Sequence, residues 1–247
     1  MRIAITQPNF LPWLGYFELL DSVDCFVALD DVQLVRRSFV VRNRAGGPGR
    51  EPLWLSMAIQ SCPTDTSLSA AYPARDRPWW RKLERQLEAH YIHAPHWPRL
   101  KPWLRDALPP REEEPVAAYN LRLLQDLAAM SGCAPARWHR ASELVPPDTT
   151  NNHAERLAAI CHALGAQDYL NFRKGIDIGL HSAEFFAAHG IRLWRQDYRH
   201  PVYPQGGSGF VERLSVIDLL AHVGADETAE VIRSGRSWTQ MPVAGAA

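Results

Sequence analysis

The chain of 247 residues lacks three features that would assign it quickly to a large class of proteins. It has no net charge, because 27 basic side chains balance 27 acidic ones, so no overall field attracts nucleic acid. Its four cysteines stand far apart and form no CxxC motif, which excludes a disulfide scaffold. No apolar run reaches the roughly 18 residues of a membrane span, and polar residues interrupt the region where a signal peptide would lie. We therefore expect a globular cytoplasmic protein.

Two short strands near the N-terminus frame a helix. Residues 2–6, RIAIT, and residues 24–31, DCFVALDD, are apolar runs rich in β-branched residues, and each ends in polar residues. Between them, Trp13 and Phe17 begin a helical repeat that continues to Val23. The pattern predicts a strand–helix–strand unit with parallel strands and a right-handed crossover.

Helices dominate the middle of the chain. Periodic apolar positions predict helices over residues 76–91, 112–132 and 150–165. Glycines at the ends of the last two supply the usual stop signal.

Strand and helix signals alternate again towards the C-terminus. Residues 167–172 and 191–198 are predicted strands, and two helices follow them. The sequence therefore predicts an α/β fold with a Rossmann-like, mostly parallel sheet flanked by helices. A helical block is inserted at roughly residues 76–165, within a single domain spanning residues 1–247.

The loop after the first strand, QPNFLPW, carries polar side chains at the place where doubly wound sheets bind ligands. Gln7 and Asn9 bring amide donors and acceptors to it. Trp13 would stack on a ring, Tyr16 would donate a hydrogen bond, and Gly15 lets a ligand approach the helix closely. The alternative is that the aromatic residues only pack into the core.

An acidic pair, Asp30 and Asp31, ends the second strand on the same edge of the predicted sheet. Such a pair can hold a ribose hydroxyl, a metal or a substrate amine, and one carboxylate can act as a general base. Equally, aspartate is common where a strand simply stops.

A basic segment follows the acidic pair. In an extended strand Arg42 and Arg44 share a face, which suits them to grip a phosphate or carboxylate. A charged edge strand exposed to solvent is the competing explanation. The substrate-binding candidates of this segment are Gln33, Arg37, Arg42, Asn43 and Arg44.

The C-terminal third holds a second concentration of polar-tipped residues. Tyr198, His200, Tyr203 and Gln205 lie on a loop stiffened by two prolines and followed by the glycine-rich stretch GGSG. We interpret it as a rigid wall followed by a movable flap, with His200 as a candidate base. Asp218 is an acid in an apolar helix: if it is buried it needs a partner, for which an arginine of the RNR segment is a candidate, and the alternative is an acid at the start of the helix that faces solvent.

Histidines at positions 90, 93 and 96 recur every third residue. They lack the cysteine or carboxylate company of common metal sites, so no metal site is predicted there.

The segments QPNFLPWLGYFELLDSVDCFVALDDVQ, RSFVVRNR and YRHPVYPQ…FVERLSVIDLLAHVG together resemble the WbqC-like protein family of bacteria. The resemblance extends through WWRKLERQLEAHYIHAP and GAQDYL to nearly the whole chain. It implies a cytoplasmic protein of polysaccharide and O-antigen biosynthesis, for which a glycine transferase role has been suggested. One departure is that Asn171 and Phe172 stand where the family usually has Ser-Gly.

The first corner also resembles, more weakly, that of nucleotidylyltransferases, whose signature is His-x-Gly-His. Here Trp13 and Tyr16 replace both histidines, so the cationic stabilisation of a transferring phosphate is missing. The likeness implies a Rossmann-like fold better than it implies adenylyl transfer.

Three hypotheses follow. The first is an aminoacyl (glycine) or acyl transferase acting on an activated sugar, with Asp30, Asp31 and His200 as catalytic candidates. The second is a nucleotide-binding enzyme that forms an adenylate or transfers a nucleotidyl group. The third is a non-catalytic protein that binds a sugar intermediate. The sequence requires no cofactor, a nucleotide would be compatible with it, and the expected partners are an activated sugar and an amino-acid donor.

Overall fold

The computed structural model describes residues 1–49, 51–149, 152–177 and 181–243. Its main sheet has six strands in the order β5-β2-β1-β6-β7-β8. All neighbours in it pair in parallel except β7 and β8. The strands are β1 (Arg2–Thr6), β2 (Cys25–Ala28), β5 (Arg137–Arg140), β6 (Asp168–Phe172), β7 (Arg192–Gln196) and β8 (Trp238–Gln240), and β3 (Arg42–Ala45) with β4 (Leu53–Ser56) forms a separate hairpin. The predicted α/β class with a mostly parallel sheet is confirmed.

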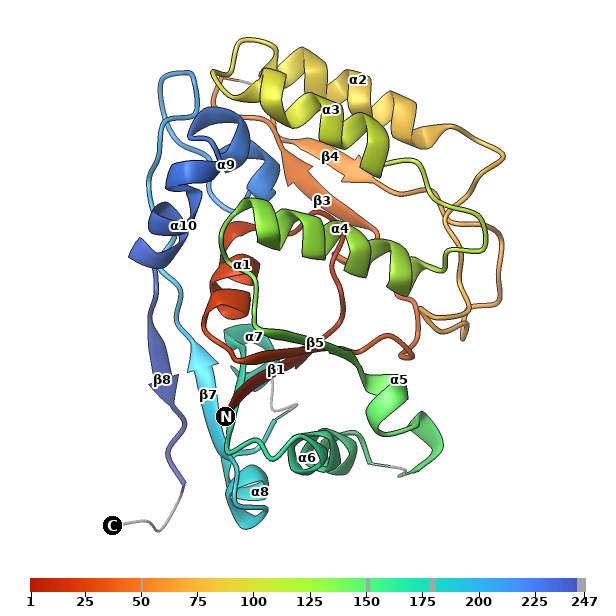
Figure 1. Cartoon of the computed structure of the whole chain (residues 1–247), viewed down its shortest axis with the longest axis vertical. Coiled ribbons are helices and arrows are strands. Elements are labelled where there is room, and N and C mark those ends of the chain that lie inside the picture. The colour runs from red at the N-terminus through yellow and green to blue at the C-terminus, as the bar shows by residue number, and fades with distance from the viewer. Residues whose placement is uncertain (50, 150–151, 178–180, 244–247) are drawn as a thin grey trace.

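Helices cover both faces of this sheet (Figure 1). On one side lie α1, α4, α9 and α10, with α2, α3 and the hairpin stacked beyond them, and α5, α6 and α8 lie on the other side. The helices are α1 (Leu14–Asp21), α2 (Trp79–Tyr91), α3 (Trp97–Ala107), α4 (Val116–Met130), α5 (Ala141–Leu144), α6 (His153–Ala163), α7 (Arg173–Asp177), α8 (Ala183–Ala188), α9 (Val216–His222) and α10 (Ala225–Ser234), and a 3-10 turn spans Pro147–Thr149.

The central strands divide the interior into two apolar clusters. Ile3 and Ile5 of β1 pack into the cluster under α6 and α8, whereas Ala4 between them packs into the cluster that contains α1 and α4. This alternation follows from the two-residue repeat of a strand, whose successive side chains point to opposite faces. Because both faces are covered, β2 and the centre of β1 are apolar runs without polar alternation, as is typical of parallel sheets.

The first strand–helix–strand unit has the predicted form. In the parallel register, Ile3 pairs with Cys25 and Thr6 pairs with Ala28. The carboxyl ends of the two strands are therefore adjacent, and the loops that follow them leave the same edge of the sheet.

The sequence pattern does not predict the strands β5 and β8, the helices α3, α5 and α7, or the 3-10 turn. Within the expected helical block, β5 is a four-residue edge strand beside β2, and its mixed polar sequence RWHR carries no apolar alternation. Helix α3 begins with Pro98 in its first turn and contains Pro102, and the sequence analysis left this proline-rich segment unassigned. The short strand β8 closes the other edge. The predicted start of α6 at residues 150–151 lies outside the described residues.

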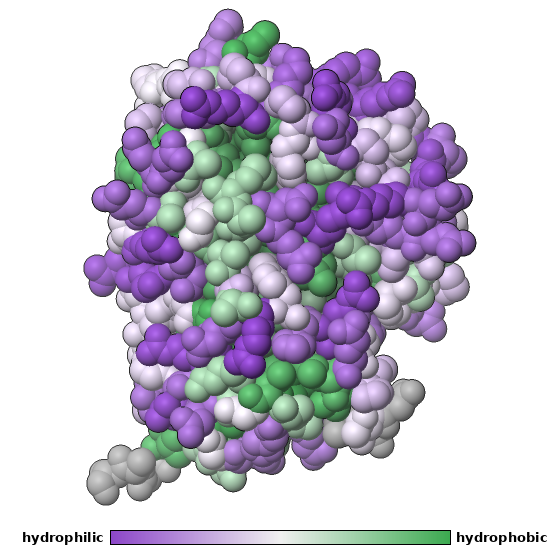
Figure 2. Space-filling model, viewed as in Figure 1, coloured by the Kyte–Doolittle hydropathy of each residue, from purple (hydrophilic) through white to green (hydrophobic). Residues whose placement is uncertain are grey.

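Polar and charged side chains cover most of the face shown in Figure 2, with apolar patches between them. Within the described residues, no helix has both the length and the apolar character that a membrane span requires.

Candidate functional site

The carboxyl edge of the parallel strands gathers most of the candidate polar residues. Gln7 and Asn9 follow β1, and both are half-buried. Between them and α1, the buried Leu11 has a φ of 42°, in the left-handed region that costs a non-glycine residue about 1–2 kcal/mol. Strain of this kind persists where the surroundings impose it, and it is concentrated at functional sites. The corner is thus a specially shaped loop as well as a packed one.

The acidic pair after β2 is fully engaged by other side chains. Both carboxylate oxygens of Asp30 accept hydrogen bonds from Ser142 at the start of α5, from its backbone nitrogen at 3.1 Å and from its hydroxyl at 2.6 Å. Asp31 forms a two-pronged ion pair with Arg156 of α6, at 2.9 and 2.5 Å, and both side chains are 8% exposed. These contacts tie the second strand to α5 and α6, and each of the four carboxylate oxygens already accepts one hydrogen bond.

The two loop concentrations seen in the sequence meet at Trp13. Its ring packs edge-on against Tyr198, with centroids 5.6 Å apart, and stacks on His200 at 6.3 Å with an angle of 19° between the planes. The ring of Tyr203 also stacks with His200, with centroids 6.3 Å apart, and the ring of Phe210 packs edge-on against His200 at 5.5 Å. The N-terminal corner and the C-terminal loop therefore form one continuous cluster.

The hydrogen bonds of His200 fix its tautomer. Its Nδ1 lies 3.0 Å from the carbonyl oxygen of Pro201, and because a carbonyl only accepts, Nδ1 carries the proton. The other ring nitrogen, Nε2, is then a lone-pair acceptor. It is buried and has no hydrogen-bond partner among the described residues, as is also true of the Tyr198 hydroxyl. Burial lowers the pKa of His200, which favours this neutral, proton-accepting form.

Gly15 makes room for the Trp13 ring. A Cβ at this position would overlap three atoms of the indole. We expect Gly15→Ala to displace Trp13 from Tyr198 and His200 and to lower the free energy of unfolding by about 1–3 kcal/mol, as overpacked sites do. Denaturant unfolding and near-ultraviolet circular dichroism measure the two effects. The double variant Gly15→Ala/Trp13→Leu should recover part of the loss, and additive losses would show that the clash is not the cause.

Asp218 anchors two glycine-rich loops from the interior. Its side chain is fully buried and accepts hydrogen bonds from the hydroxyls of Tyr91 at 2.9 Å and Tyr203 at 2.8 Å, and from the amide of Gln205 at 3.1 Å. The Tyr91 hydroxyl also accepts the backbone N–H of Gly46. The candidate arginine partner is therefore wrong, since the donors are neutral, and burial raises the pKa of this carboxyl.

Two further candidates are buried and already bonded. Tyr16 is fully buried, its hydroxyl donates to the carbonyl of Gln7 at 2.7 Å, and burial raises its pKa. Asn43 is 2% exposed and donates to the carbonyl of Phe10 at 3.1 Å. Both residues hold the corner in shape, and their polar groups do not reach solvent.

The arginines of β3 share one face of the hairpin, as predicted from their spacing. Arg42 lies over the ring of Trp54, 4.5 Å from its centroid, and Arg44 donates to the carbonyl of Glu212 at 3.3 Å. Gln33 and Arg37 are exposed, and Gln33 donates to the carbonyl of Thr64. Arg44 is thereby linked to the segment next to the His200 loop, whereas Gln33 is bonded to another loop.

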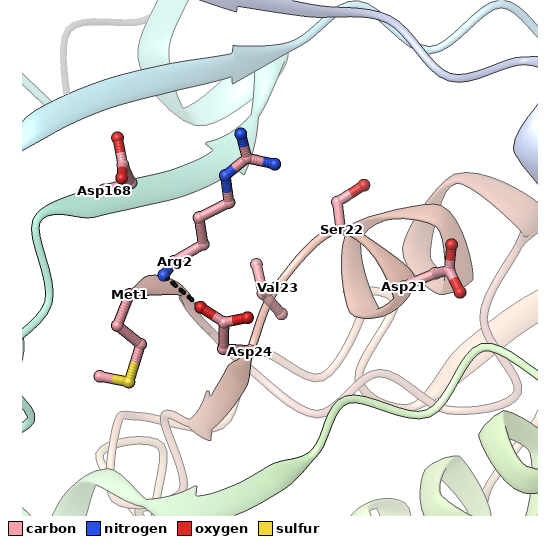
Figure 3. Close-up of a pocket in the computed structure, with 7 residues that line it drawn as sticks. All are labelled: Met1, Arg2, Asp21, Ser22, Val23, Asp24 and Asp168. Atoms are coloured by element: carbon pink, nitrogen blue, oxygen red, sulfur yellow. Dashed lines mark hydrogen bonds between the residues drawn. The ribbon is translucent and has the colours of Figure 1, made fainter.

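A groove of about 460 Å³ lies at the opposite, amino edge of the sheet (Figure 3). The side chain of Arg2 extends between Asp168 and Ser22, and its backbone nitrogen donates to Asp24 at 2.8 Å. Two of the acids are already paired, Asp168 with Arg192 and Asp21 with Arg233. The sequence does not predict this groove, because its residues come from the end of α1, the connection to β2 and the starts of strands, and they carry no motif. Its acids stabilise the edge and leave little free chemistry.

Within the described residues, histidine, cysteine and acidic side chains form no group suited to hold a metal ion.

Comparison with known proteins places this geometry in context. The sequence model of the WbqC-like protein family matches residues 7–230. Uncharacterized protein Rv1507c of Mycobacterium tuberculosis (strain ATCC 25618 / H37Rv) is 27% identical over 229 residues, which cover 91% of this chain and 95% of that protein. No solved structure matches. Both the corner and the His200 loop lie inside the matched region.

Proposed function

We propose, from the premise that the chain belongs to the WbqC-like protein family, that it is a cytoplasmic transferase of bacterial surface polysaccharide or O-antigen biosynthesis. It moves an aminoacyl group, glycine first among the candidates, or another acyl group onto an activated sugar. One observation carries the proposal: two loops nearly 190 residues apart meet at Trp13 around a buried imidazole nitrogen that has no partner among the described residues.

The chemistry assigned to this cluster is proton transfer. An amine or hydroxyl of the acceptor sugar loses its proton to Nε2 of His200 while its nitrogen or oxygen forms a bond to the acyl carbon. The bond from that carbon to its leaving group breaks, and the proton passes from His200 to the departing group. The carboxylates of Asp30 and Asp31 are less suited to this role, since their oxygens are already bonded.

Substrate charge is assigned to the neighbouring basic and amide groups. Arg44 makes one contact of 3.3 Å to a carbonyl and retains further donors for a phosphate. Arg42 adds positive charge on the same face of β3, and the amide of Gln7 lies at the end of β1. The aromatic face of Trp13 suits a sugar or base ring.

The test is a transfer assay with the purified full chain. Candidate nucleotide sugars are incubated with glycyl or acyl donors, and mass spectrometry follows the acceptor. We expect the acceptor to gain the mass of one transferred group only when enzyme and donor are both present. If every donor and acceptor pair leaves the acceptor mass unchanged, the proposal fails.

A second candidate is nucleotide-dependent activation, because the order of the parallel strands, β5-β2-β1-β6-β7, is that of dinucleotide-binding sheets. In this reading the carboxyl edge binds ATP and forms an adenylate. Calorimetry with ATP and a non-hydrolysable analogue separates the two candidates, since the transferase reading requires no ATP binding.

A further inference from the structure

A chain of hydrogen bonds fixes the orientation of a second buried histidine. The backbone N–H of Phe172 donates to Oδ1 of Asn171 at 2.7 Å, which identifies the other end of this amide as its donor. That Nδ2 group donates to the hydroxyl of Tyr169 at 2.7 Å and to Nε2 of His181 at 3.0 Å. The Tyr169 hydroxyl in turn donates to the carbonyl of Ile5 at 3.3 Å. Each proton donated in this series of hydrogen bonds therefore has a single acceptor.

This series of hydrogen bonds assigns the proton of His181 to Nδ1. Because Nε2 accepts from Asn171, a neutral imidazole must carry its proton on the other nitrogen. His181 is 8% exposed, and Nδ1 is buried without a hydrogen-bond partner among the described residues. Leaving such a donor unsatisfied costs free energy, and native proteins rarely do so without a functional reason.

The position of His181 supplies that reason. The first connection leads from β1 towards β2 on one side of the sheet, and that after β6 leads to β7 on the other side. Ligands of open parallel sheets bind at this switch point, beyond the carboxyl ends of the two strands. Asn171 lies at the end of β6 and holds His181 there.

Two neighbours favour an anion at this place. His153 is the first residue of α6, and its ring lies 6.2 Å from that of His181. The first turn of α6 carries positive potential, and although the side chain of Asn152 accepts the N–H of Ala154 at 2.9 Å, a helix start of this length favours an anion. Gly175 packs closely against the His181 ring, since a Cβ at position 175 would lie 3.3 Å from two of the ring atoms. Burial, followed by the nearby His153, lowers the pKa of His181 to about 4, so it donates as a neutral group.

We propose that Nδ1–H of His181, with the N-terminal turn of α6, binds an anionic oxygen at the β1/β6 switch point. The ligand class is a phosphoryl group, such as that of an activated sugar. The anion site rests on the contacts of His181, Asn171 and His153 and on the first turn of α6, and it does not depend on the proposed function. Its assignment to the phosphate of the transfer substrate rests on the proposed function.

The experiment uses the full chain labelled with 15N-histidine. Long-range proton–nitrogen spectra report which nitrogen of each ring is protonated. We expect the Nδ1–H tautomer for His181. We also expect added inorganic phosphate or pyrophosphate to shift the His181 signals until they saturate. Acetate is titrated in parallel to test whether a carboxylate binds instead. A stronger shift with acetate than with either phosphate would reassign the ligand class and overturn the phosphoryl proposal. An Nε2–H tautomer, or signals that phosphate leaves unchanged, would overturn the site itself.

Three variants sharpen the test. His181→Gln and His181→Phe should each weaken phosphate binding by about tenfold or more, the factor that corresponds to a lost hydrogen bond of about 1.4 kcal/mol. His93→Gln, at an exposed position, should bind phosphate as the parent does. Binding that is unchanged in both His181 variants, measured by calorimetry on protein whose circular dichroism shows it folded, contradicts the proposal. Phosphate binding without any acyl transfer would leave this site in place while the proposed function fails.

Discussion

Replacing Arg156 by methionine is expected to lower the free energy of unfolding by about 3–5 kcal/mol. Arg156 and Asp31 are each 8% exposed, and the guanidinium also donates to the carbonyl of Val145 from two of its nitrogens, at 3.0 and 2.8 Å. Methionine fills much of the same volume but donates nothing, so the carboxylate of Asp31 is left buried and unpaired. Urea unfolding followed by circular dichroism measures the loss.

The matched control is Arg105→Met. Arg105 pairs with Asp106 on the surface, where the side chains are 65% and 71% exposed, and the loss should stay below about 1 kcal/mol. The double variant Arg156→Met/Asp31→Leu should recover stability relative to Arg156→Met, because it removes the unpaired charge. Equal losses for the Arg156 and Arg105 variants would mean that the buried pair does not hold α6 to the sheet.

The same ion pair shows how far the sequence leads. That Asp30 and Asp31 end a strand follows from the apolar run before them, and the parallel pairing puts them on the edge that Gln7 also leaves. Their partners do not follow, because Arg156 lies 125 residues away and Ser142 lies 112 away, on helices whose docking depends on the whole fold. Asp30 and Asp31, which the sequence alone could equally place at an exposed strand end, thus have buried side chains that bond to distant residues.

The aromatic cluster gives the opposite lesson. Tyr198, His200 and Tyr203 were identified as candidates from local composition alone, and Trp13 from the corner loop. What composition cannot reveal is that their rings meet, or that Nε2 of His200 ends without a partner among the described residues. His181 carried no signal at all, since its role depends on the bond from Asn171 and on the strand order. Contacts between distant segments, rather than residue types, define both places.

If His200 is the general base of an acyl transfer, His200→Gln should lower kcat by about 10²- to 10⁴-fold, the range typical of a lost general base. The KM for the sugar should change little, because the proton acceptor acts mainly in the transition state. Steady-state kinetics in the mass-based assay measure both constants. His93→Gln serves as the matched exposed control, with unchanged kinetics expected.

The pH profile separates catalysis by His200 from a purely structural role. Burial lowers the pKa of this imidazole below its ordinary value of about 6.5, and the base works in its neutral form. The parent should therefore keep full activity through neutral pH and lose it only as the pH falls through that lowered pKa. In His200→Gln this acid limb should disappear along with most of the rate. Two results would contradict catalysis by His200: a His200→Gln variant that retains the same acid limb, or one that loses affinity for the sugar while kcat stays constant. Either result would assign the cluster to binding and support a non-catalytic carrier of the sugar intermediate.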